Sequence, residues 1–353
     1  MQRLANTLNQ AGFPTRTVRF SDGTRLLLLP HGGRLLGVYP PKSNLNFLWT
    51  HDALRSPKTV RALYIEARWP NPGGDRTWLA PVPELFFSDM SKLWEAFREP
   101  VALDPGHYAC ENRCNVLRLV NRATLQLFRS KTTARVEIAK RFLPAPNPLR
   151  YEPAFEGAYE YAGCTSVISL RLLSDSAKVR SPLGLYQLLQ LPPGGEMIIP
   201  THSKARPLVM FGTIPHRHLE SESHVVRYRM ASKVTAKIAL RAVHTTGRIG
   251  YVHQSRLGKY DLVIRNFFVN PSGEYVDPPF DSLRDLGYSI QACNVAEPTL
   301  GFFNELEHHA PAVGAGTGTK DYTDVSQIWA FRGNRNIIAD ISQLLLGCMP
   351  KFE

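Results

Sequence analysis

The sequence predicts an all-β protein, a sandwich or barrel of antiparallel strands with few short helices. First, short runs of strand-forming residues recur along the whole chain, with turns about every eight to twelve residues. Second, the chain contains 25 glycines and 27 prolines, which can form the sharp returns between such strands. Third, the strands do not alternate with helical patterns, so parallel βαβ units are not predicted.

The first strands are predicted from a hairpin pattern near the N-terminus. Residues 15–20 and 24–29 flank a turn at Asp22-Gly23, and residues 34–39 resume the pattern after a Pro-His-Gly-Gly break. The same reasoning predicts strands at residues 115–120, 123–128, 134–142, 165–173, 184–191, 196–200, 208–213, 224–229, 237–243, 248–254, 260–269 and 301–307.

Helical patterns are confined to three places. An amphipathic N-terminal pattern ends at Gly12, a second covers residues 89–97, and a third covers residues 282–286 in part. No internal repeat or low-complexity segment divides the chain, and similar strand patterns flank the proline-rich residues 144–148. We therefore predict a single domain that spans residues 1–353.

The chain is basic, with a formal net charge of +12. This charge is compatible with nucleic acid, a membrane surface or an acidic polysaccharide as a partner. The basic residues are scattered singly, however, and no run of five or more occurs, which argues against nucleic acid. No uninterrupted apolar stretch is long enough to span a membrane. We expect a carbohydrate partner, and diffuse positive charge fits an anionic sugar or sugar phosphate.

The cysteines and the N-terminus favour a soluble cytoplasmic protein. An odd number of cysteines without a compact framework argues against a disulfide-stapled secreted domain. Cys110 and Cys114 lie four residues apart, but no second pair follows at zinc-ribbon spacing, so we expect no metal. The N-terminus lacks the apolar core of a signal peptide. The five cysteines are Cys110, Cys114, Cys164, Cys293 and Cys348.

Residues 301–311 combine two carboxylates with two imidazoles. Alternate side chains of an extended strand share a face, so Glu305, Glu307 and His309 would project together with Phe303. An acid, a base and an aromatic platform on one face suit acid–base chemistry on a sugar carbon. The alternative interpretation is an edge strand that carries solvated charge.

A second candidate segment leads from Trp69 to Trp78. Gly74 can adopt positive φ and allows close approach of the backbone to a ligand. Asp75 and Arg76 supply a carboxylate and a planar donor fork, and the two tryptophans offer flat apolar faces. These groups are typical of a carbohydrate site. The alternative is a Gly-Gly turn with a local Asp–Arg pair and two core tryptophans.

Several histidines are further candidates. His216 and His218 would share a face in an extended segment, where they could bind a metal together with a distant carboxylate or act as an acid near neutral pH. The alternative is that both are surface side chains. His31, in the Pro-His-Gly-Gly loop, is a candidate for substrate binding.

Several classes of chemistry lack their sequence signatures. The chain has no Gly-rich phosphate loop ahead of Lys-Ser/Thr, no His-Glu-x-x-His and no Gly-x-Ser-x-Gly. Nucleotide-driven transfer, zincin proteolysis and α/β-hydrolase chemistry are therefore not predicted.

Five segments in the right order resemble galactose mutarotase-like proteins, and in particular a bacterial branch of that superfamily. The resemblance covers roughly residues 15–335. The matching segments are the Gly-Gly-Arg strand at residues 32–39, the Gly-Gly-Asp-Arg-x-Trp-x-Ala-Pro signature at 73–81, the Tyr-x-x-x-Gln-x-x-x-Gly-Gly element around 185–195, the block ending in Gly-x-Tyr-x-Asp at 260–277, and the acidic strand with its following proline at 305–311.

The resemblance implies a large antiparallel β supersandwich with a sugar-binding groove on its concave face. In the aldose 1-epimerases of this superfamily a late-strand Glu removes the anomeric proton, a His acts as acid on the ring oxygen and an Arg steadies the sugar, without a cofactor. By position, the Glu matches Glu305 or Glu307 and the Arg matches Arg76. The paired-His motifs of those enzymes are absent, so the resemblance leaves the acid unidentified.

Three functions are compatible with these observations. The first is a cofactor-independent sugar epimerase or mutarotase. The second is a polysaccharide lyase acting on acidic sugars, and the third is a carbohydrate-binding protein without catalysis. For the first, the candidate residues are Glu305 or Glu307 as the base, His309, His216 or His218 as the acid, and Arg76 with Asp75 as the substrate clamp.

Overall fold

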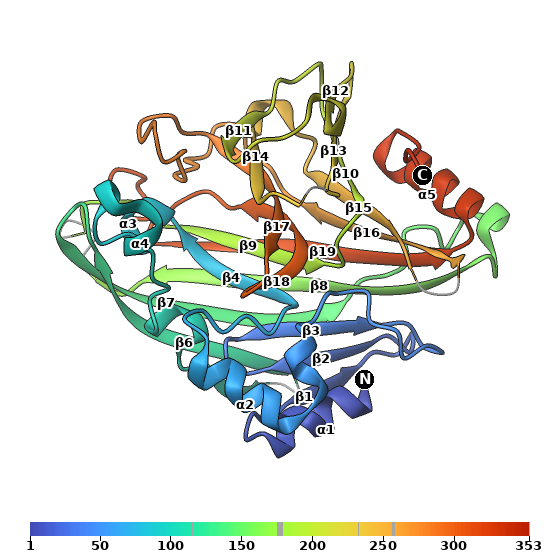
Figure 1. Cartoon of the computed structure of the whole chain (residues 1–353), viewed down its shortest axis with the longest axis horizontal. Helices are drawn as coiled ribbons and strands as arrows, with labels where there is room; N and C mark the ends of the chain where they lie inside the picture. Colours follow the sequence, from blue (N-terminus) through green and yellow to red (C-terminus); the bar gives the residue numbers. More distant parts are fainter. Residues whose placement is uncertain (114–115, 175–178, 232, 256–257, 353) are drawn as a thin grey trace.

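The computed structural model describes residues 1–113, 116–174, 179–231, 233–255 and 258–352. Within these residues, two large sheets of antiparallel strands dominate the chain (Figure 1). This architecture confirms the predicted all-β fold class. It arises because apolar side chains on the inner faces of the two sheets pack together, while several central strands are buried on both faces.

The first sheet has nine strands within the described residues, in the order β1-β2-β3-β4-β9-β18-β17-β14-β11. Strands distant in sequence therefore lie side by side at its centre, where β18 pairs with both β9 and β17. The strands are β1 (Arg16–Arg19), β2 (Arg25–Leu29), β3 (Arg34–Tyr39), β4 (Asp75–Ala80), β9 (Gly184–Leu191), β11 (Leu208–Phe211), β14 (Ala236–Arg241), β17 (Tyr288–Glu297) and β18 (Gly301–His309).

The second sheet has ten strands in the described part of the chain, ordered β12-β13-β10-β15-β16-β19-β8-β7-β6-β5. Its longest strands run along the horizontal axis of Figure 1. The strands are β5 (Ala109–Arg113), β6 (Val116–Leu127), β7 (Thr132–Pro144), β8 (Tyr159–Leu172), β10 (Glu196–Pro200), β12 (Leu219–Ser221), β13 (Val225–Arg229), β15 (Arg248–Gln254), β16 (Tyr260–Phe267) and β19 (Asp321–Gly333).

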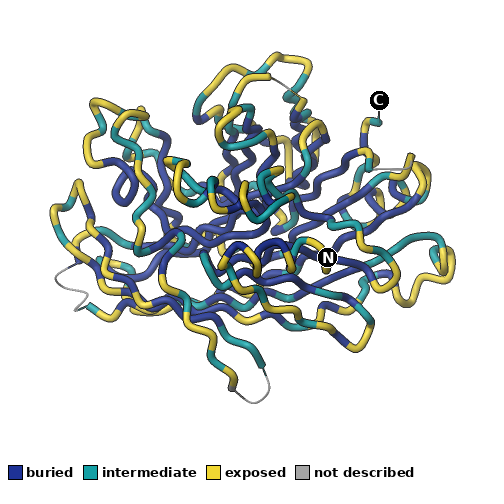
Figure 2. The backbone as a smooth tube through the Cα atoms, turned by 60° about the horizontal axis from the view of Figure 1, so that its bottom comes forward, coloured by how far each residue is buried: buried dark blue, intermediate teal, exposed yellow. Residues whose placement is uncertain are grey.

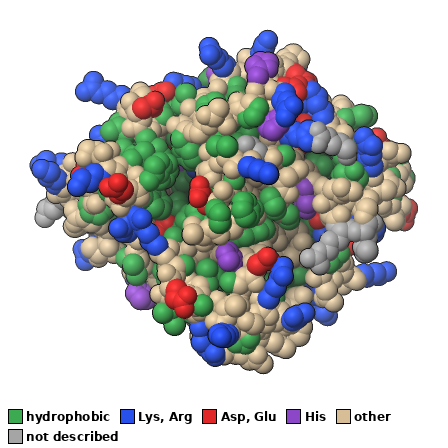
Figure 3. Space-filling model, viewed as in Figure 1, with side chains coloured by type: hydrophobic (Ala, Val, Ile, Leu, Met, Phe, Trp, Pro, Cys, Tyr) green, Lys and Arg blue, Asp and Glu red, His purple; other side chains and the backbone are tan. Residues whose placement is uncertain are grey.

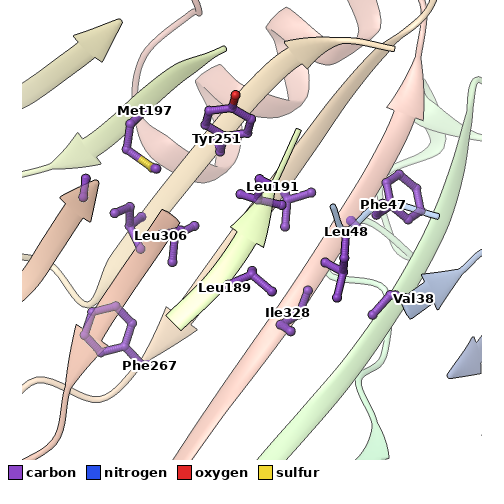
Figure 4. Close-up of a cluster of buried hydrophobic side chains, with 14 of the residues drawn as sticks. Val38, Phe47, Leu48, Leu189, Leu191, Met197, Tyr251, Phe267, Leu306 and Ile328 are labelled. Atoms are coloured by element: carbon purple, nitrogen blue, oxygen red, sulfur yellow. The ribbon is translucent and has the colours of Figure 1, made fainter. Parts of the chain in front are cut away.

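The main hydrophobic core lies between the two sheets (Figure 4). Leu189 and Leu306 from the first sheet and Ile328 and Tyr251 from the second belong to this cluster, and each is fully buried. Figure 2 shows buried backbone concentrated in the strands and exposed backbone mainly in the peripheral loops. Side chains on the opposite face of the first sheet therefore point away from the core.

Helices cover the outer faces of both sheets. The amphipathic α1 (Gln2–Gln10) and α2 (Pro57–Glu66) pack through Leu8 and Val60 on the outer face of β2 and β3. On the second sheet, α5 (Arg335–Leu346) packs through Ile338 and Ile341. It begins at Asn334, whose side chain accepts from the Ile337 amide, and ends at a glycine in the left-handed conformation.

Residues 81–106 form a long crossover between β4 and β5 that we call the cover segment. It contains the short helices α3 (Val82–Leu85) and α4 (Leu93–Ala96). Phe86 and Phe97 stack on each other and lie near Trp78 of β4. The cover segment thus packs against the outer face of the first sheet.

The structure differs from the sequence prediction at several elements. Residues 282–286 form turns rather than a helix, and residues 89–97 form only the short α4 with a preceding helical turn. The elements that were not predicted are the strands β4, β5, β12, β17 and β19 and the helices α2, α3 and α5. Asn115, the expected start of one strand, and Cys114 lie outside the described residues.

The cysteines that the structure describes are all free thiols. Among the described residues, no helix combines the length and the apolar character needed to cross a bilayer.

Candidate active site

Strand β18 positions the acidic residues that the sequence singled out. Leu306 faces the core between the sheets, and therefore Glu305, Glu307 and His309 share the opposite, outer face, as the alternation predicts. All three side chains are buried rather than solvated. The alternative of an edge strand with solvated charge is wrong, because β18 is a central strand paired on both sides.

Arg76 neutralises Glu305. Its Nη2 donates to Glu305 Oε1 at 2.9 Å, and Gln190 Nε2 on β9 donates to the same oxygen at 3.0 Å. The guanidinium lies over two tryptophan rings, 4.0 Å from the Trp78 centroid and 4.6 Å from that of Trp69. Cation–π contacts of this kind hold the guanidinium in one orientation. The two tryptophans therefore contact Arg76 with their faces.

Asp104, at the end of the cover segment, is a second carboxylate beside Arg76. It forms an ion pair with Arg34 at 3.0 Å, accepts a hydrogen bond from Trp78 Nε1 at 2.8 Å, and lies 4.0 Å from Arg76 Nη1. Burial alone would raise the pKa of Asp104, but Arg34 and Arg76 together lower it below its usual value. Asp104 therefore stays ionised and fixes both arginine side chains.

Glu307 lies in a separate cluster with Tyr186 of β9 and Lys237 of β14. Lys237 Nζ donates to Glu307 Oε2 at 2.9 Å and to the Tyr186 hydroxyl at 2.7 Å. The Tyr186 hydroxyl in turn donates a short hydrogen bond to Glu307 Oε2. Gln291 of β17 accepts from Lys237 at 3.2 Å. A carboxylate, a phenol and an ammonium group thus meet around one oxygen atom.

Burial sets the protonation of this cluster. It raises the pKa of Glu307 to about 7, with the nearby Glu305 adding to the rise and Lys237 opposing it. Burial also raises the pKa of Tyr186 well above its usual value, and the charge on Glu307 adds to that shift. The pKa of Lys237 is raised because its carboxylate neighbours outweigh the burial. At neutral pH Tyr186 holds its proton, Lys237 is cationic and Glu307 can exchange a proton.

Several buried polar atoms of the two clusters lack a hydrogen-bond partner among the described residues. They include Glu307 Oε1, Arg76 Nε and Nη1, and Gln190 Oε1. Buried polar groups are normally satisfied by protein, water or ligand. A free carboxylate oxygen, two guanidinium nitrogens and an amide oxygen on one face therefore provide both donors and acceptors for a polar ligand.

His309, one of three candidate acids in the sequence, is buried beside the Glu307 cluster, and neither of its ring nitrogens has a hydrogen-bond partner among the described residues. Its ring stacks on Tyr186, with centroids 4.1 Å apart, and its Nε2 lies 4.0 Å from Asp277 Oδ2. Burial lowers the pKa of His309 well below its usual value, and Lys237 lowers it further. The imidazole is therefore neutral at physiological pH. Its geometry supports a role in positioning the Tyr186 ring.

An aromatic rim borders the Lys237 side of the site. Phe211, Phe280 and Trp94 contact one another edge-to-face or stacked, at centroid distances of 5.5 to 6.0 Å. Lys237 Nζ lies 5.9 Å from the Phe211 ring, and the Trp94 side chain is about half exposed, at 52%. Figure 3 shows hydrophobic side chains gathered around a hollow on this face, over β9 and β18. The rim is suited to contact a flat or apolar ligand surface.

The two carboxylates of β18 and a neighbouring cysteine of β17 form a group of three potential metal ligands. Atoms of Cys293, Glu305 and Glu307 lie within 4.8 Å of one another. However, burial raises the pKa of the Cys293 thiol well above its usual value, so it is not a thiolate. Arg76 and Lys237 already neutralise the two carboxylates. The donor set therefore suits hydrogen-bonded acid–base chemistry better than a metal centre.

Asp75 and Gly74 lie outside the cluster around Arg76. Asp75 points to the other face of β4, where it forms an ion pair with Arg265 of the second sheet at 2.7 Å. Gly74 has positive φ, and a Cβ there would lie 2.4 Å from the Leu35 carbonyl oxygen. The backbone that approaches Gly74 closely is that of β3. The structure gives Asp75 and Gly74 contacts within the sandwich rather than contacts with the carboxylates.

The remaining histidine candidates lie at other places in the fold. His216 is exposed, and His218 lines a cavity beside β12, β13 and β15 of the second sheet. His31 lines a smaller cavity of about 140 Å³ together with Trp69 and Asp104. His31 therefore lies beside the Arg76 cluster, whereas His218 belongs to a different surface.

Sequence reasoning missed Tyr186, Lys237, Gln190 and Asp104. Tyr186 and Gln190 fall within the segment that carries the family resemblance, but nothing in the sequence pairs β9 with β18. Lys237 belongs to β14, which joins the site only because β17 lies between it and β18. A sheet topology was needed to bring these side chains together.

No protein-family model matches the sequence, and no curated protein matches it. Among solved structures, a galactose mutarotase related enzyme from Lactobacillus acidophilus aligns with a TM-score of 0.47 and 8% identity, covering 89% of this chain and 96% of that chain. A Klebsiella pneumoniae protein assigned as an aldose 1-epimerase aligns with a TM-score of 0.48 and 9% identity, covering 96% and 84%. A galactose 1-epimerase from Lactobacillus acidophilus NCFM gives 0.43 and 9%, covering 91% and 100%.

Proposed function

We propose that this protein binds a sugar on the outer face of β4, β9, β18 and β14, and interconverts the anomers of that sugar without a cofactor. The observation that carries the proposal is the Glu307 carboxyl. It is buried, it has a pKa of about 7, and its Oε1 has no hydrogen-bond partner among the described residues. A base with a pKa near the working pH is the most effective in general acid–base catalysis.

The proposed reaction uses one base and one acid. Glu307 takes the proton of the hydroxyl on the anomeric carbon, the bond between that carbon and the ring oxygen breaks, and the ring oxygen receives a proton. The open-chain aldehyde then rotates about its first carbon–carbon bond and closes on its other face by the reverse steps. No atom is gained or lost, and the protein returns to its starting protonation.

Tyr186 is the best-placed acid. Its hydroxyl keeps its proton because burial raises its pKa, and Lys237 donates a hydrogen bond to the same oxygen at 2.7 Å. A cationic donor stabilises the phenolate that forms when the proton leaves. His309 has no such cation-assisted contact, and its neutral ring stacks on Tyr186. Tyr186 with Lys237 would therefore replace the imidazole acid of the enzymes that the sequence resembles.

Arg76 and Gln190 would hold the sugar. Both contact Glu305 and both retain buried polar atoms without partners in the described chain. Sugar hydroxyls can both donate to Gln190 Oε1 and accept from Arg76. Trp94 on the rim offers an exposed aromatic face for the ring of the sugar.

The test is the rate of anomer interconversion, followed by polarimetry with a panel of freshly dissolved aldoses. We expect the wild-type protein to accelerate interconversion of at least one sugar, and Glu307→Gln to remove the acceleration. Glu152→Gln, at an exposed site, is the matched control and should keep the full rate. Addition of EDTA should leave the rate unchanged. If no aldose interconverts faster than in buffer, the proposed activity is wrong.

Two further assays distinguish the other two functions. A lyase would generate the ultraviolet absorbance of an unsaturated uronate from an acidic polysaccharide. A binding protein without catalysis would show a rise in melting temperature with a sugar and no turnover. Either result, in place of faster interconversion, would replace the epimerase proposal.

A further inference from the structure

A small cavity borders the Arg76 cluster on the outer face of the first sheet. It has a volume of about 140 Å³ and lies between the end of α2, the turn before β3, residues 68–72 and the last part of the cover segment. We call it the His31 cavity, after the candidate histidine that the proposed function does not use. Its lining includes Tyr64, Trp69 and Glu99, none of which contacts the Glu307 carboxyl.

Three buried polar atoms of this lining lack a hydrogen-bond partner among the described residues: the Tyr64 hydroxyl oxygen, Trp69 Nε1 and Glu99 Oε1. Buried polar groups are normally satisfied by protein, water or ligand. The indole N–H can only donate, an ionised carboxylate can only accept, and the phenol can do both. The wall therefore offers donors and acceptors together, which is the combination that a set of hydroxyl groups can satisfy.

Neighbouring side chains hold two of these groups in place. The Tyr64 ring stacks on Phe13, with centroids 4.1 Å apart, and meets the His31 ring edge-to-face at 5.0 Å. The Trp69 ring lies against the Arg76 guanidinium, whose carbon is 4.6 Å from the ring centroid. Because both rings are fixed by these contacts, a ligand would lose little free energy in ordering them.

The charges of the lining balance one another. Arg34 and Asp104 form an ion pair at 3.0 Å, with side chains only 1% and 8% exposed. Burial raises the pKa of Glu99 to about 7, so at pH 8 it is ionised and balances the charge of Arg68. Burial also lowers the pKa of His31, which is therefore neutral. A lining without net charge favours a neutral ligand over an anion or a cation.

The rest of the wall is apolar, and the volume limits the size of the ligand. Pro70, Pro72, Val101 and Pro105 can contact the carbon atoms of a ligand. An apolar cavity of about 150 Å³ encloses a molecule of the size of benzene, which has about six heavy atoms. A cavity of about 140 Å³ therefore encloses a polyol of about three or four carbons, but not a whole hexose ring.

We propose that the His31 cavity binds a small neutral polyol of the size of glycerol or erythritol. The hydroxyl groups of the polyol accept from Trp69 Nε1, donate to Glu99 Oε1 and exchange a hydrogen bond with the Tyr64 hydroxyl, while its carbon chain packs on the prolines and Val101. The site is separate from the Glu307 cluster and does not depend on the proposed anomer interconversion.

The indole N–H of Trp69 provides a direct measurement. The chain has five tryptophans, so protein labelled with ¹⁵N at the indole nitrogen gives five indole signals in a two-dimensional NMR spectrum. Trp69→Phe and Trp94→Ala each remove one signal and so identify these two. We expect erythritol at pH 8 to shift the Trp69 signal saturably, because the N–H gains an acceptor, and to leave the Trp94 signal on the rim of the Glu307 site in place.

A second probe separates hydrogen bonding from simple filling of an apolar space. 1-Butanol has the same number of carbons as erythritol but only one hydroxyl group. We expect it to bind at least about tenfold more weakly, because most of the hydrogen bonds to the wall are lost.

Two variants locate the binding. Tyr64→Phe removes a hydroxyl that has no partner within the described chain and keeps the stacked ring, so it should fold normally and weaken erythritol binding by about two- to tenfold. Glu99→Gln keeps the shape of the side chain, loses the charged acceptor and should weaken binding by about tenfold at pH 8. Tyr151→Phe, at a tyrosine that is 78% exposed, is the matched control and should bind normally.

Glu307→Gln separates this proposal from the proposed function. It should bind erythritol with unchanged affinity even if it loses anomer interconversion. The polyol site is overturned if erythritol leaves the Trp69 signal unshifted, if it shifts the Trp94 signal instead, or if 1-butanol binds as tightly. Erythritol binding of wild-type strength in both Tyr64→Phe and Glu99→Gln, or its loss in Glu307→Gln, would also overturn it.

Discussion

Glu307 combines two properties at the scale of a single residue. It is fully buried, and one of its oxygens is held by Tyr186 and Lys237 while the other is without a partner among the described residues. Burial disfavours the carboxylate, whereas Lys237 favours it, and the balance leaves the pKa at about 7. A carboxyl group with its usual pKa would be a weaker base at neutral pH.

The rate of interconversion should therefore depend on pH. The base acts only when ionised, so activity should rise as pH increases through about 7 and fall as Glu307 becomes protonated below that value. A rate profile between about pH 3.5 and pH 9 measures this, with buffer-catalysed interconversion subtracted. A profile that is flat through pH 7, or that rises around pH 4.5, would show that Glu307 has no raised pKa.

Tyr186 can act as the acid only while it has its hydroxyl group and Lys237 lies beside that group. Tyr186→Phe keeps the ring that stacks on His309 and removes the proton donor. Proton transfer by a positioned side chain contributes about 10²- to 10⁴-fold, so we expect a fall in kcat within that range and little change in KM. Polarimetry measures both constants. His309→Gln is the comparison variant, and a larger fall in kcat for it than for Tyr186→Phe would restore the histidine as the acid.

Alternation along β18 was sufficient to predict which of its residues share a face. Glu305, Glu307 and His309 do project together, because the strand is regular over this stretch. The partners were beyond prediction from one sequence. Tyr186 and Lys237 lie more than fifty residues from Glu307 along the chain, and only the strand order brings them within hydrogen-bond distance.

At the scale of elements, β4 links the site to the core of the sandwich. Arg76 and Trp78 face the carboxylates, while Asp75 reaches the other sheet and pairs with Arg265 of β16. Both members of this pair are nearly inaccessible to solvent. Arg76 therefore contributes to the candidate site, whereas its neighbour Asp75 contributes to the stability of the fold. The sequence motif, which suggested both residues as one substrate clamp, could not reveal that they point to opposite faces of β4.

Asp75→Asn should destabilise the protein without impairing sugar binding. Breaking a buried ion pair leaves Arg265 uncompensated, which costs about 3–5 kcal/mol of unfolding free energy. Urea denaturation measures this loss. Asp52→Asn removes an exposed ion pair with Arg55 and is the control, for which we expect almost no change. Unchanged stability together with a raised KM in Asp75→Asn would support the predicted substrate clamp.

The cover segment places Trp94 on the rim of the site. Arg68 holds this part of the segment by donating to the carbonyl oxygens of Trp94, Glu95 and Phe97. Because the Trp94 side chain is about half exposed but packs on Phe211 and Phe280, Trp94→Ala should lower the melting temperature modestly. Loss of an aromatic contact of about 0.5–1.5 kcal/mol should raise KM by about two- to tenfold. A lower kcat with unchanged KM would contradict a binding role for Trp94.

Sequence patterns predicted β1 and β11 at the two edges of the first sheet, but they did not predict β5 and β12 at the edges of the second. The N-terminal amphipathic helix is present as α1. The expected helix at 282–286 fails because the stretch is too short to form one away from packed neighbours. Strand β17 contains Ser, Gln, Asn and two Ala residues, which have low strand propensity, so its composition does not mark it as a strand.

At the scale of the whole molecule, we propose that residues 1–353 form one cooperative unit. The main hydrophobic cluster contains residues as distant in sequence as Phe20 and Ala330, and it joins both sheets. Differential scanning calorimetry should therefore show a single transition whose calorimetric and van't Hoff enthalpies agree. Two resolved transitions would indicate two domains.

The central claim is that Glu307, and not Glu305, is the base. The two residues share a face of one strand, but Glu305 is engaged with Arg76 and Gln190. The most direct measurement is exchange NMR between the two anomers of the best sugar, with wild type, Glu307→Gln and Glu305→Gln at pH 8. We expect Glu307→Gln to lose about 10²-fold or more of the catalysed exchange rate at saturating sugar, and Glu305→Gln mainly to raise KM. Loss of the saturated rate in Glu305→Gln with retention in Glu307→Gln would contradict the account.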